Sequence, residues 1–358
     1  MGLILNDLKN ACELEHVCDY VNNRTTSSMN YISTENMLPN KGGISESTII
    51  PPGTTTEYKI GDILISNIRP YFQKIWCADR CGGCSADVLC IRAKENTDSK
   101  YLYYLLSQQA FFDYVMSGAK GCKMPRGDKK QIMQWPVNIP AIDVQKKVVA
   151  ILSSLDNKIR LNRRINDNLE EQAKALFNHY FIQNTENLGE WQDGVLTDIA
   201  QYLNGLAMQK YPAMPNEAGL PVLKIKELGQ GQCDTNSDRC SSLIKPEYII
   251  SDGTIIFSWS GTLLVDIWCG GKCGLNQHLF KVSSAKYPQW FVFYWTKHHL
   301  NKFIRIAKDK AVTMGHIKRC DLEISKVKIP SKQALVNLDK LFSPIFNRMV
   351  TCRIENRK

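Results

Sequence analysis

The sequence predicts an α+β protein in which two homologous globular domains are separated by a long antiparallel two-helix coiled coil, as a pseudo-twofold internal repeat. Two observations lead to this prediction: the chain repeats itself after about 190 residues, and each copy ends in a segment with a heptad pattern. A period of that length is far longer than a solenoid or propeller unit, so it indicates two domains. The 358-residue length also favours two domains over one.

Three pairs of similar segments, in the same order in both halves, carry the repeat. Their offsets are 182, 192 and 190 residues, and such a small drift is hard to produce by chance. The pairs are LEHVCDYVN (14–22) with LTDIAQYLN (196–204), KIGDILISNIRPYFQKIWC (59–77) with SDGTIIFSWSGTLLVDIWC (251–269), matched at Ile-Trp-Cys, and KGCKMPRGDKKQIMQWPVNIP (120–140) with KDKAVTMGHIKRCDLEISKVKIP (308–330). We therefore expect a first domain at 1–140, a central helix at 141–183, a second domain at 184–330 and a C-terminal helix at 331–358.

Each copy mixes strand and helix patterns. Short β-branched runs after a glycine-containing turn predict strands at Asp62–Ser66 and Thr254–Ser258. Aromatic-rich stretches with helical spacing predict helices at 100–114 and 289–306. Final extended strands stopped by proline are expected at 135–140 and 325–330.

A long helix without internal proline or glycine is predicted from Ala141 to Phe181. At 1.5 Å per residue it would span roughly 60 Å. Its apolar and asparagine positions follow one another in alternating steps of four and three, which is a heptad seam. The seam contains Val148, Leu152, Leu155, Ile159, Asn162, Asn166, Leu169, Ala173, Leu176 and Tyr180, and its first six positions recur 190 residues later as Leu338, Phe342, Ile345, Met349, Cys352 and Asn356. Two helices with matching seams can pair, and antiparallel pairing would relate the two halves.

Two asparagines, Asn162 and Asn166, fall on this seam. Buried asparagines weaken a coiled coil but fix its register and orientation, which is the role we expect for them. The alternative is a helix that packs on a domain surface with its asparagines in solvent. Residues 169–180 have no counterpart in the C-terminal copy. They must therefore pack elsewhere or remain available to another subunit.

The composition is that of a folded protein, with 44% hydrophobic and 22% charged residues. No run of 18 apolar residues is present, and the N-terminus lacks a basic region followed by an apolar one. We therefore expect neither a membrane span nor export, and a cytoplasmic location. The 13 cysteines are an odd set that favours free thiols. A net charge of +10 favours a polyanionic partner.

The sequence resembles the specificity subunits of type I restriction–modification systems over essentially its whole length. The combination of phrases is specific, although each one alone is weak. The phrases are YISTENMLPNKGG (31–43), GDILISNIRPYFQKIW (61–76), IPAIDVQKKVVAILSSLDNKIRLNRRINDNLEEQAKALF (139–177), GEWQDGVLTDIA (189–200) and DGTIIFSWSGT (252–262).

The resemblance implies two target-recognition domains that each read one half of a bipartite, asymmetric DNA sequence, in phage defence, with the paired helices as a spacer. It also implies that the helices dock methyltransferase subunits, two in number, and that restriction/translocase subunits assemble on that core. S-adenosylmethionine, ATP and Mg are then expected only on those partners. The C-terminal helix departs from the pattern, because it lacks a counterpart of EEQAKALFNHYF (170–181). The symmetry of docking is therefore open.

Two basic loops at matched positions are candidates for phosphate contacts, which supply affinity for DNA. Matching loops in two homologous domains favour this reading over solvated surface charge, which is the alternative. The candidates are Lys120, Lys123, Arg126, Lys129 and Lys130 in the first domain, and Lys308, Lys310, His316, Lys318 and Arg319 in the second.

Residues that follow the two matched strands are candidates for base contacts, because they include donors suited to guanine or adenine edges. They are Arg69, Tyr71, Gln73 and Lys74 in the first domain, Trp259, Ser260 and Thr262 in the second, and Gln277 and His278 farther on. The two sets differ chemically, as two readers of different sequences would. Unconstrained loops would differ as well.

Four cysteines with the spacing C-x3-C-x2-C-x5-C suggest a zinc site at Cys77, Cys81, Cys84 and Cys90. The second copy keeps only Cys269 and Cys273, followed by His278. A structural metal should be needed in both copies, so we expect reduced thiols and no metal.

The motifs of catalysis are missing from the sequence. There is no G-x-x-x-x-G-K-[ST] loop, no G-x-G-x-x-G after a strand, no Asn-Pro-Pro-Tyr-like run and no H-E-x-x-H. No carboxylate–lysine cluster follows Asp62 and Asp87. We therefore expect a non-catalytic DNA-recognition subunit without a cofactor of its own. The alternatives are the recognition part of a self-contained restriction–methylation enzyme, and a protein scaffold with no DNA role.

Overall fold

The computed structural model describes residues 11–26, 29–47, 53–183, 191–214, 216–309 and 316–357. The chain divides into two compact units, residues 1–155 (unit 1) and 156–358 (unit 2). Because this division falls inside the central helix, the four segments expected from the sequence remain a prediction. Within the described ranges, no helix is both long and apolar enough to cross a membrane.

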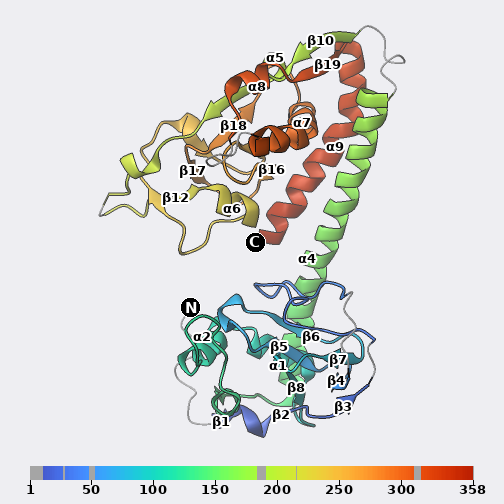
Figure 1. The fold of residues 1–358 in the computed structure, drawn as a ribbon, viewed down its shortest axis with the longest axis vertical. Coiled ribbons are helices and arrows are strands. Elements are labelled where there is room, and N and C mark those ends of the chain that lie inside the picture. Colours follow the sequence, from blue (N-terminus) through green and yellow to red (C-terminus); the bar gives the residue numbers. More distant parts are fainter. Residues whose placement is uncertain are drawn as a thin grey trace. The chain divides into compact units, whose positions relative to one another are not determined.

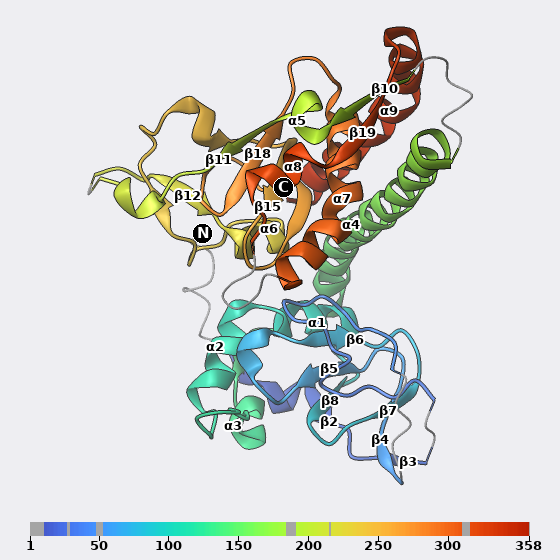
Figure 2. The ribbon, with the colours of Figure 1, turned by 45° about the horizontal axis from the view of Figure 1, so that its top comes forward.

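A four-stranded antiparallel sheet with the order β2-β8-β5-β6 lies at the centre of unit 1 (Figure 1). A second sheet has the order β3-β4-β7, and β1 pairs with β9. Helices α2 and α3 lie at one end of the unit and the second sheet lies at the other (Figure 2). The bounds are β1 Cys12–Glu13, β2 Cys18–Tyr20, β3 Arg24–Thr25, β4 Thr55–Tyr58, β5 Ile63–Ser66, β6 Ile75–Cys77, β7 Gly82–Cys84, β8 Val88–Ala93, β9 Pro136–Val137, α1 Ser99–Leu106, α2 Gln109–Ser117 and α3 Lys129–Met133, with 3-10 turns at Leu14–His16 and Pro70–Phe72.

Strand β5 is buried along its whole length because it separates two cores. Ile63 and Ile65 belong to a cluster on one face of the sheet, and Leu64 belongs to a cluster on the other. This alternation follows from the two-residue period of a strand. The sequence of β5 is therefore apolar without interruption until Ser66, as expected for a strand covered on both faces.

Unit 2 has the same strand order in its main sheet, β11-β18-β15-β16. Its second sheet has the order β13-β12-β17-β14, and β10 pairs with β19. The bounds are β10 Trp191–Val195, β11 Gln201–Asn204, β12 Leu220–Leu223, β13 Arg239–Cys240, β14 Ile249–Ile250, β15 Thr254–Ser258, β16 Leu264–Trp268, β17 Cys273–Leu275, β18 Leu279–Ser283, β19 Lys326–Pro330, α5 Leu196–Ile199, α6 Ile225–Gln230, α7 Gln289–Asp309 and α8 Arg319–Glu323, with 3-10 turns at Met208–Lys210 and Pro246–Tyr248.

Strand register confirms the predicted duplication. In unit 1 Tyr20 pairs with Ile91, and in unit 2 Tyr202 pairs with Val282. The offset between the two tyrosines is 202 − 20 = 182, which is the value that the first pair of similar segments predicts.

The Ile-Trp-Cys match, by contrast, is out of register by two residues. The N–H of Gly61 donates to the carbonyl of Ala78 at 2.9 Å, and the N–H of Gly253 donates to the carbonyl of Trp268 at 2.8 Å. Ala78 therefore corresponds to Trp268, an offset of 268 − 78 = 190 instead of 192. The hairpin turn of unit 2 is two residues shorter. A shift of two keeps the same face of a strand, so Trp76 and Trp268 are both buried.

The predicted antiparallel helix pair is present. Helix α4 (Ile142–Phe177) and helix α9 (Lys332–Arg357) run side by side in unit 2, and α4 continues into a π-helical turn at Asn178–Gln183 (Figure 1). Asn162 bonds Asn356, whereas the ring of Phe181 lies 6.4 Å from that of Phe342. The two helices therefore run in opposite directions.

Asn162 is a buried polar contact between these helices, with 3% of its surface exposed. Its Nδ2 donates to Glu355 Oε2 and to Asn356 Oδ1, both at 3.0 Å. The Nδ2 of Asn356 in turn donates to the carbonyl of Ile159 at 3.4 Å. Buried polar groups with specific partners fix the register of paired helices, so Asn162 has the location and contacts expected for that role.

Replacing Asn162 by alanine is expected to destabilise the chain by about 1–3 kcal/mol, because Asn356 loses a partner inside the helix pair. Denaturant unfolding of the full chain measures this change. The control is Arg160→Ala on the exposed part of the same helix, with an expected effect within about 0.5 kcal/mol. Equal effects of both substitutions would contradict a specific contact at Asn162.

The seam prediction is wrong at one position, Leu155, which is 54% exposed. The reason is the length of α9: Asn356, near its end, already lies beside Ile159, so earlier residues of α4 have no α9 to face. The other seam residues are buried or half-buried. Buried are Asn162, Ala173, Leu338, Phe342, Met349 and Cys352, and half-buried are Val148, Leu152, Ile159, Asn166, Leu169, Leu176, Tyr180, Ile345 and Asn356.

The part of α4 without a repeat counterpart packs on the core of unit 2. Ala173, Phe177 and Phe181 are at most 3% exposed and belong to the main hydrophobic cluster of that unit. The rings of Phe177 and Phe181 stack at 5.0 Å, and Phe177 also meets Trp295 edge-on at 5.1 Å. Of the two outcomes expected for residues 169–180, the structure shows packing within the chain.

A bidentate ion pair joins the last turn of α9 to the turn before β15, within unit 2. Arg357 Nη1 and Nη2 donate to the two carboxylate oxygens of Asp252 at 2.6 and 2.9 Å. The guanidinium of Arg357 holds the pKa of Asp252 below its ordinary value of 3.8. A lowered pKa means that this contribution is present above pH 3.8 and is lost as the pH falls through the folded-state value.

We expect Asp252→Asn to cost roughly 1 kcal/mol near neutral pH and nothing in strong acid, where the carboxylate of the parent chain is protonated too. The free energies of unfolding of the two chains, measured from pH 7 down to pH 2, should therefore converge. A constant difference across that range would show that the ion pair is not the cause.

The first turn of α4 is fixed to unit 1 by Gln145, which is fully buried. Its Oε1 accepts from the N–H of Asp98 at 2.8 Å, and its Nε2 donates to the carbonyls of Asn96 and Pro140 at 3.0 and 2.8 Å. The side chain thus joins the helix start to the segment that caps α1.

Candidate nucleic-acid interface

In unit 1, the two loops that the sequence proposes for DNA contact lie against each other. Ile68, in the turn after β5, forms a backbone bridge with Arg126 in the basic loop before α3. The N–H of Arg69 also donates to the carbonyl of Pro125 at 2.8 Å. These contacts join the proposed base-reading turn and the proposed phosphate-binding loop into one surface.

The basic loop is closed at its base. The backbones of Lys120 and Arg126 exchange two hydrogen bonds of 2.9 Å, and the loop between them needs Gly121 at φ +100°, a conformation that favours glycine. Lys120 Nζ lies 3.0 Å from Asp128 Oδ2 and lowers the pKa of that carboxyl. Arg126 Nη2 lies 3.1 Å from Asp87.

These ion pairs leave the cations free to meet a polyanion, because the side chains remain 83% exposed at Lys120 and 56% exposed at Arg126. Exposed lysine and arginine side chains can contact phosphates without reading sequence. The exposed cations of this surface are Lys120, Lys123, Arg126, Lys129 and Lys130.

The candidate residues in the turn after β5 differ: some are exposed to solvent, and others make hydrogen bonds within the protein. Tyr71 is 49% exposed. Lys74 instead donates from Nζ to the carbonyl of Thr34 at 2.7 Å, so it holds a neighbouring segment in place. Arg69 is half-buried, and its Nε is a buried donor without a partner among the described residues. A buried donor without a hydrogen-bond partner costs free energy of folding, so such donors are rare in native structures.

Sequence reasoning missed a third segment of this surface. The N–H of Asn40 donates to the carbonyl of Phe72 at 2.8 Å, and the N–H of Lys41 donates to the carbonyl of Gln73 at 3.0 Å. The side-chain amide of Gln73 bonds that of Gln109. The available signal was the run Asn-Lys-Gly-Gly, since Asn40 and Lys41 both adopt positive φ, at 54° and 60°.

In unit 2, three predicted groups also meet at the end of the matching strand. Ser260 forms a backbone bridge with His316. The N–H of Ile317 donates to the carbonyl of Trp259 at 3.2 Å, and the N–H of Trp259 donates to the carbonyl of His278 at 3.3 Å. The segment before α8, the turn after β15 and the segment before β18 thus form one surface.

The two surfaces occupy equivalent positions in their units. The bridge Ile68–Arg126 corresponds to the bridge Ser260–His316, with offsets of 260 − 68 = 192 and 316 − 126 = 190. The same backbone arrangement carries arginine and lysine in unit 1 and tryptophan and histidine in unit 2. Different chemistry on one scaffold is what two readers of different sequences require.

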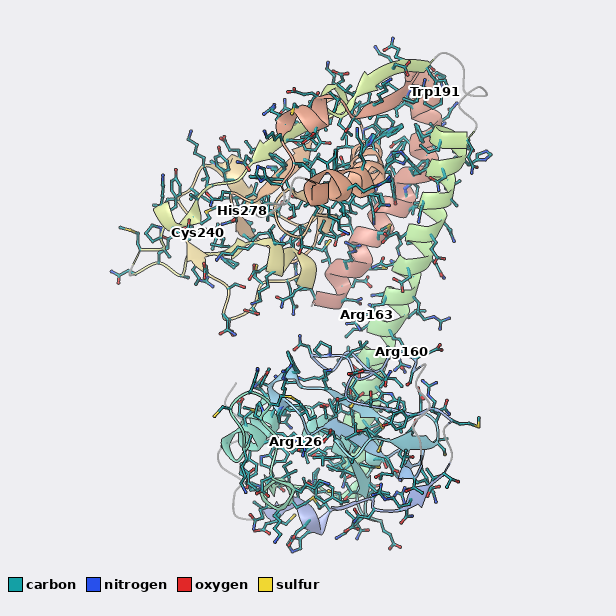
Figure 3. All side chains as sticks on the ribbon, viewed as in Figure 1. Arg126, Arg160, Arg163, Trp191, Cys240 and His278 are labelled. Atoms are coloured by element: carbon teal, nitrogen blue, oxygen red, sulfur yellow. The ribbon has the colours of Figure 1, made fainter. Side chains whose placement is uncertain are left out.

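Trp259 lies between two histidines. Its ring centroid is 5.9 Å from that of His278 and 6.1 Å from that of His316, and its Nε1 donates to Asn204 Oδ1 at 3.0 Å. The Nδ1 of His278, labelled in Figure 3, is buried without a partner among the described residues. Gln277 lies beside the other ring nitrogen at 3.4 Å.

The remaining candidates of unit 2 differ in exposure. Ser260 is 8% exposed, so it supports the surface more than it presents a side chain. Arg319 lies 3.8 Å from Glu323 on the same helix. Lys310 lies outside the described residues. The exposed candidates are Thr262, Lys308, His316, Lys318 and Arg319.

The cysteines of the proposed zinc pattern differ in environment: Cys84 and Cys90 are buried, Cys77 is half-buried and Cys81 is exposed. Burial raises the pKa of Cys77 to about 11, which favours a neutral thiol over the thiolate that a metal needs. In the described part of the chain, no three His, Cys, Asp or Glu residues are grouped as metal ligands.

Comparisons with known proteins connect this arrangement to a family. Residues 9–171 match the family model of the type I restriction modification DNA specificity domain. The type I restriction enzyme MjaIX specificity subunit of Methanocaldococcus jannaschii is 24% identical over 280 residues, 72% of this chain and 64% of that protein. The HindI specificity subunit of Haemophilus influenzae is 29% identical over 161 residues, 42% of this chain and 35% of that protein. The matches thus span less than two thirds of these relatives.

A crystal structure of a type I restriction–modification system S subunit from M. genitalium has the same fold, with a TM-score of 0.51 and 13% identity over 99% of this chain and 97% of that one. By its match over residues 9–171 and by the named relatives, the chain is similar to the specificity subunits of type I restriction–modification systems.

Proposed function

We propose that the chain reads a bipartite, asymmetric DNA sequence, one half with each unit, and has no catalytic activity of its own. The single observation that carries this proposal is the pair of equivalent surfaces. At the end of β5 and of β15, the same backbone bridge joins chemically different side chains. A scaffold that is kept while its side chains change suits two readers with different preferences.

The partners that fit this function are double-stranded DNA, two methyltransferase subunits and restriction/translocase subunits. The paired helices α4 and α9 would space the readers and dock the methyltransferase subunits. S-adenosylmethionine, ATP and Mg would be bound by those subunits and not by this chain. The complex would act in the cytoplasm, where host and phage DNA are found.

Mapping of methylated adenines in host DNA, with this chain present and then deleted, tests the proposal. One bipartite motif should lose methylation on deletion. An exchange of residues 191–330 for the same region of a related subunit should then change one half of the motif only. Methylation that is unaffected by deletion would contradict the proposal.

The alternative of a self-contained restriction–methylation enzyme has its own test. The purified chain, incubated alone with DNA and S-adenosylmethionine, should transfer no methyl group. Methyl transfer without added subunits would replace our proposal by this alternative.

The basic loop of unit 1 gives a prediction about salt. The triple substitution Lys120→Gln, Lys123→Gln, Arg126→Gln should lower the slope of log affinity against log salt by roughly 2–3, since each lost phosphate contact removes about 0.9. Titrations of duplex DNA at several salt concentrations measure the slope. Lys59→Gln, an exposed lysine at the other end of β5, is the matched control and should leave the slope unchanged.

A further inference from the structure

The turn between β5 and β6 exposes two neighbouring aromatic side chains. Tyr71 is 49% exposed and Phe72 is 38% exposed, and their ring centroids are 4.7 Å apart. The proposed function invokes phosphate contacts and polar base contacts. Neither kind of contact explains why the apolar faces of these two rings are exposed. Large apolar groups held together in solvent mark a surface that becomes covered.

The backbone of this turn is fixed on both sides. The 3-10 turn Pro70–Phe72 lies between Arg69 and Gln73, and both of these residues adopt the left-handed conformation with φ 51°. A left-handed conformation costs conformational energy for a residue other than glycine, so it persists only where surrounding contacts stabilise it. Such residues are frequent at functional sites. Here the Arg69 N–H bonds the carbonyl of Pro125, and the Phe72 carbonyl accepts from Asn40. The aromatic pair is therefore presented in one position before binding.

The surroundings combine apolar and cationic side chains. The segments that hydrogen-bond to the turn also expose Leu38 and Met124, at 39% and 49%. Lys120 and Lys123, in the same loop as Met124, are exposed. An apolar centre with cations around it fits a base step flanked by phosphates, whereas a protein partner would need acidic groups to meet the lysines.

Unit 2 has no such aromatic pair at the equivalent turn. That turn is two residues shorter and contains Ser260, Gly261 at φ +64° and Thr262. The aromatic residue near it, Trp259, is half-buried and bonded through its ring nitrogen to Asn204. Of the two equivalent turns, only that of unit 1 carries the aromatic pair.

From these contacts we infer that Tyr71 and Phe72 form a wedge that enters a base step of the half-site read by unit 1, unstacks it and bends the duplex. Steps of pyrimidine followed by purine are the ones that open most easily, so unit 1 selects its half-site partly through the deformability of such a step. This inference depends on the proposed function, because it assumes that unit 1 binds duplex DNA.

The test uses the full chain and short duplexes that carry the motif found by methylation mapping. Successive adenines of each half are replaced by 2-aminopurine, whose fluorescence rises when it is unstacked. Binding should raise the fluorescence at one step, in one half only. The double substitution Tyr71→Ser, Phe72→Ser should abolish most of this rise and weaken binding to the motif roughly tenfold or more.

Two variants keep the result interpretable. Tyr71→Phe retains the ring and should retain the rise. Ile60→Ser removes an apolar side chain that is 69% exposed at the other end of β5, and should change neither fluorescence nor affinity. Thermal unfolding of each variant checks that the fold is kept.

The outcomes separate the wedge from the proposed function. A chain that binds duplex DNA without any rise in fluorescence, or a double variant that keeps the rise, overturns the wedge and leaves the reader intact. A chain without salt-dependent DNA binding overturns both. A double variant with normal unstacking that no longer binds methyltransferase subunits assigns the aromatic pair to a protein interface, and also overturns the wedge.

Discussion

Replacing Phe342 by alanine is expected to destabilise unit 2 by about 3–5 kcal/mol, the usual loss for a fully buried phenylalanine. Phe342 has no exposed surface, and its ring stacks on that of Trp290 at 4.2 Å with an interplanar angle of 11°. It also lies near the rings of Phe181 and Tyr294, at 6.4 and 6.0 Å. One substitution therefore removes contacts to α7, including the stack, and to the π-helical turn that follows α4.

Guanidinium unfolding followed by tryptophan fluorescence measures this loss, because Trp290 reports on the affected core. The control is Leu341→Ala on the same helix, where the side chain is 44% exposed and the expected loss is below about 1 kcal/mol. A loss at Phe342 as small as that of the control would show that α9 is not part of the core of unit 2.

Replacing Trp259 by alanine is expected to abolish recognition of the half-site read by unit 2. The tryptophan ring fills the space between His278 and His316, and its N–H bonds Asn204. Loss of one well-positioned base contact costs about 1–3 kcal/mol, so affinity for the full motif should fall roughly 10- to 100-fold. Affinity for unrelated DNA should change little, since phosphates provide it.

Competition with duplexes altered in one half at a time locates the defect. The variant should no longer distinguish duplexes changed in the half read by unit 2, while it still rejects duplexes changed in the other half. Leu243→Ala, at a position of unit 2 that is 84% exposed, is the control with expected wild-type selectivity. Equal loss of selectivity for both halves would mean that Trp259 supports the whole protein and not one reading surface.

Local patterns predicted several elements, although the single helix expected at 100–114 is wrong, because the chain forms two helices there, α1 and α2. The β-branched run at Thr254–Ser258 is β15 with the same bounds, and the aromatic-rich stretch from Gln289 begins α7 at that residue. The helix pair followed from the heptad spacing, and its antiparallel direction followed from the internal repeat. Each of these features depends on residues that are close in sequence or that recur with a regular period. Both kinds of pattern can be recognised in one sequence.

The assembly of the surfaces could not be predicted in the same way. The bridge between Ile68 and Arg126 joins positions that are far apart in sequence, and no periodicity connects them. Lys74 shows the consequence: its residue type suggested DNA contact, but its ammonium bonds the carbonyl of Thr34. The burial of Ser260 likewise depends on chain segments that the local sequence does not reveal.

The buried amide of Gln145 has a mechanical consequence. With three hydrogen bonds to Asp98, Asn96 and Pro140, it prevents the root of α4 from turning independently of the β-sheet domain before it. The first turn of α4 and this domain would therefore move as one body, and the direction in which the helix leaves the domain is fixed at its start.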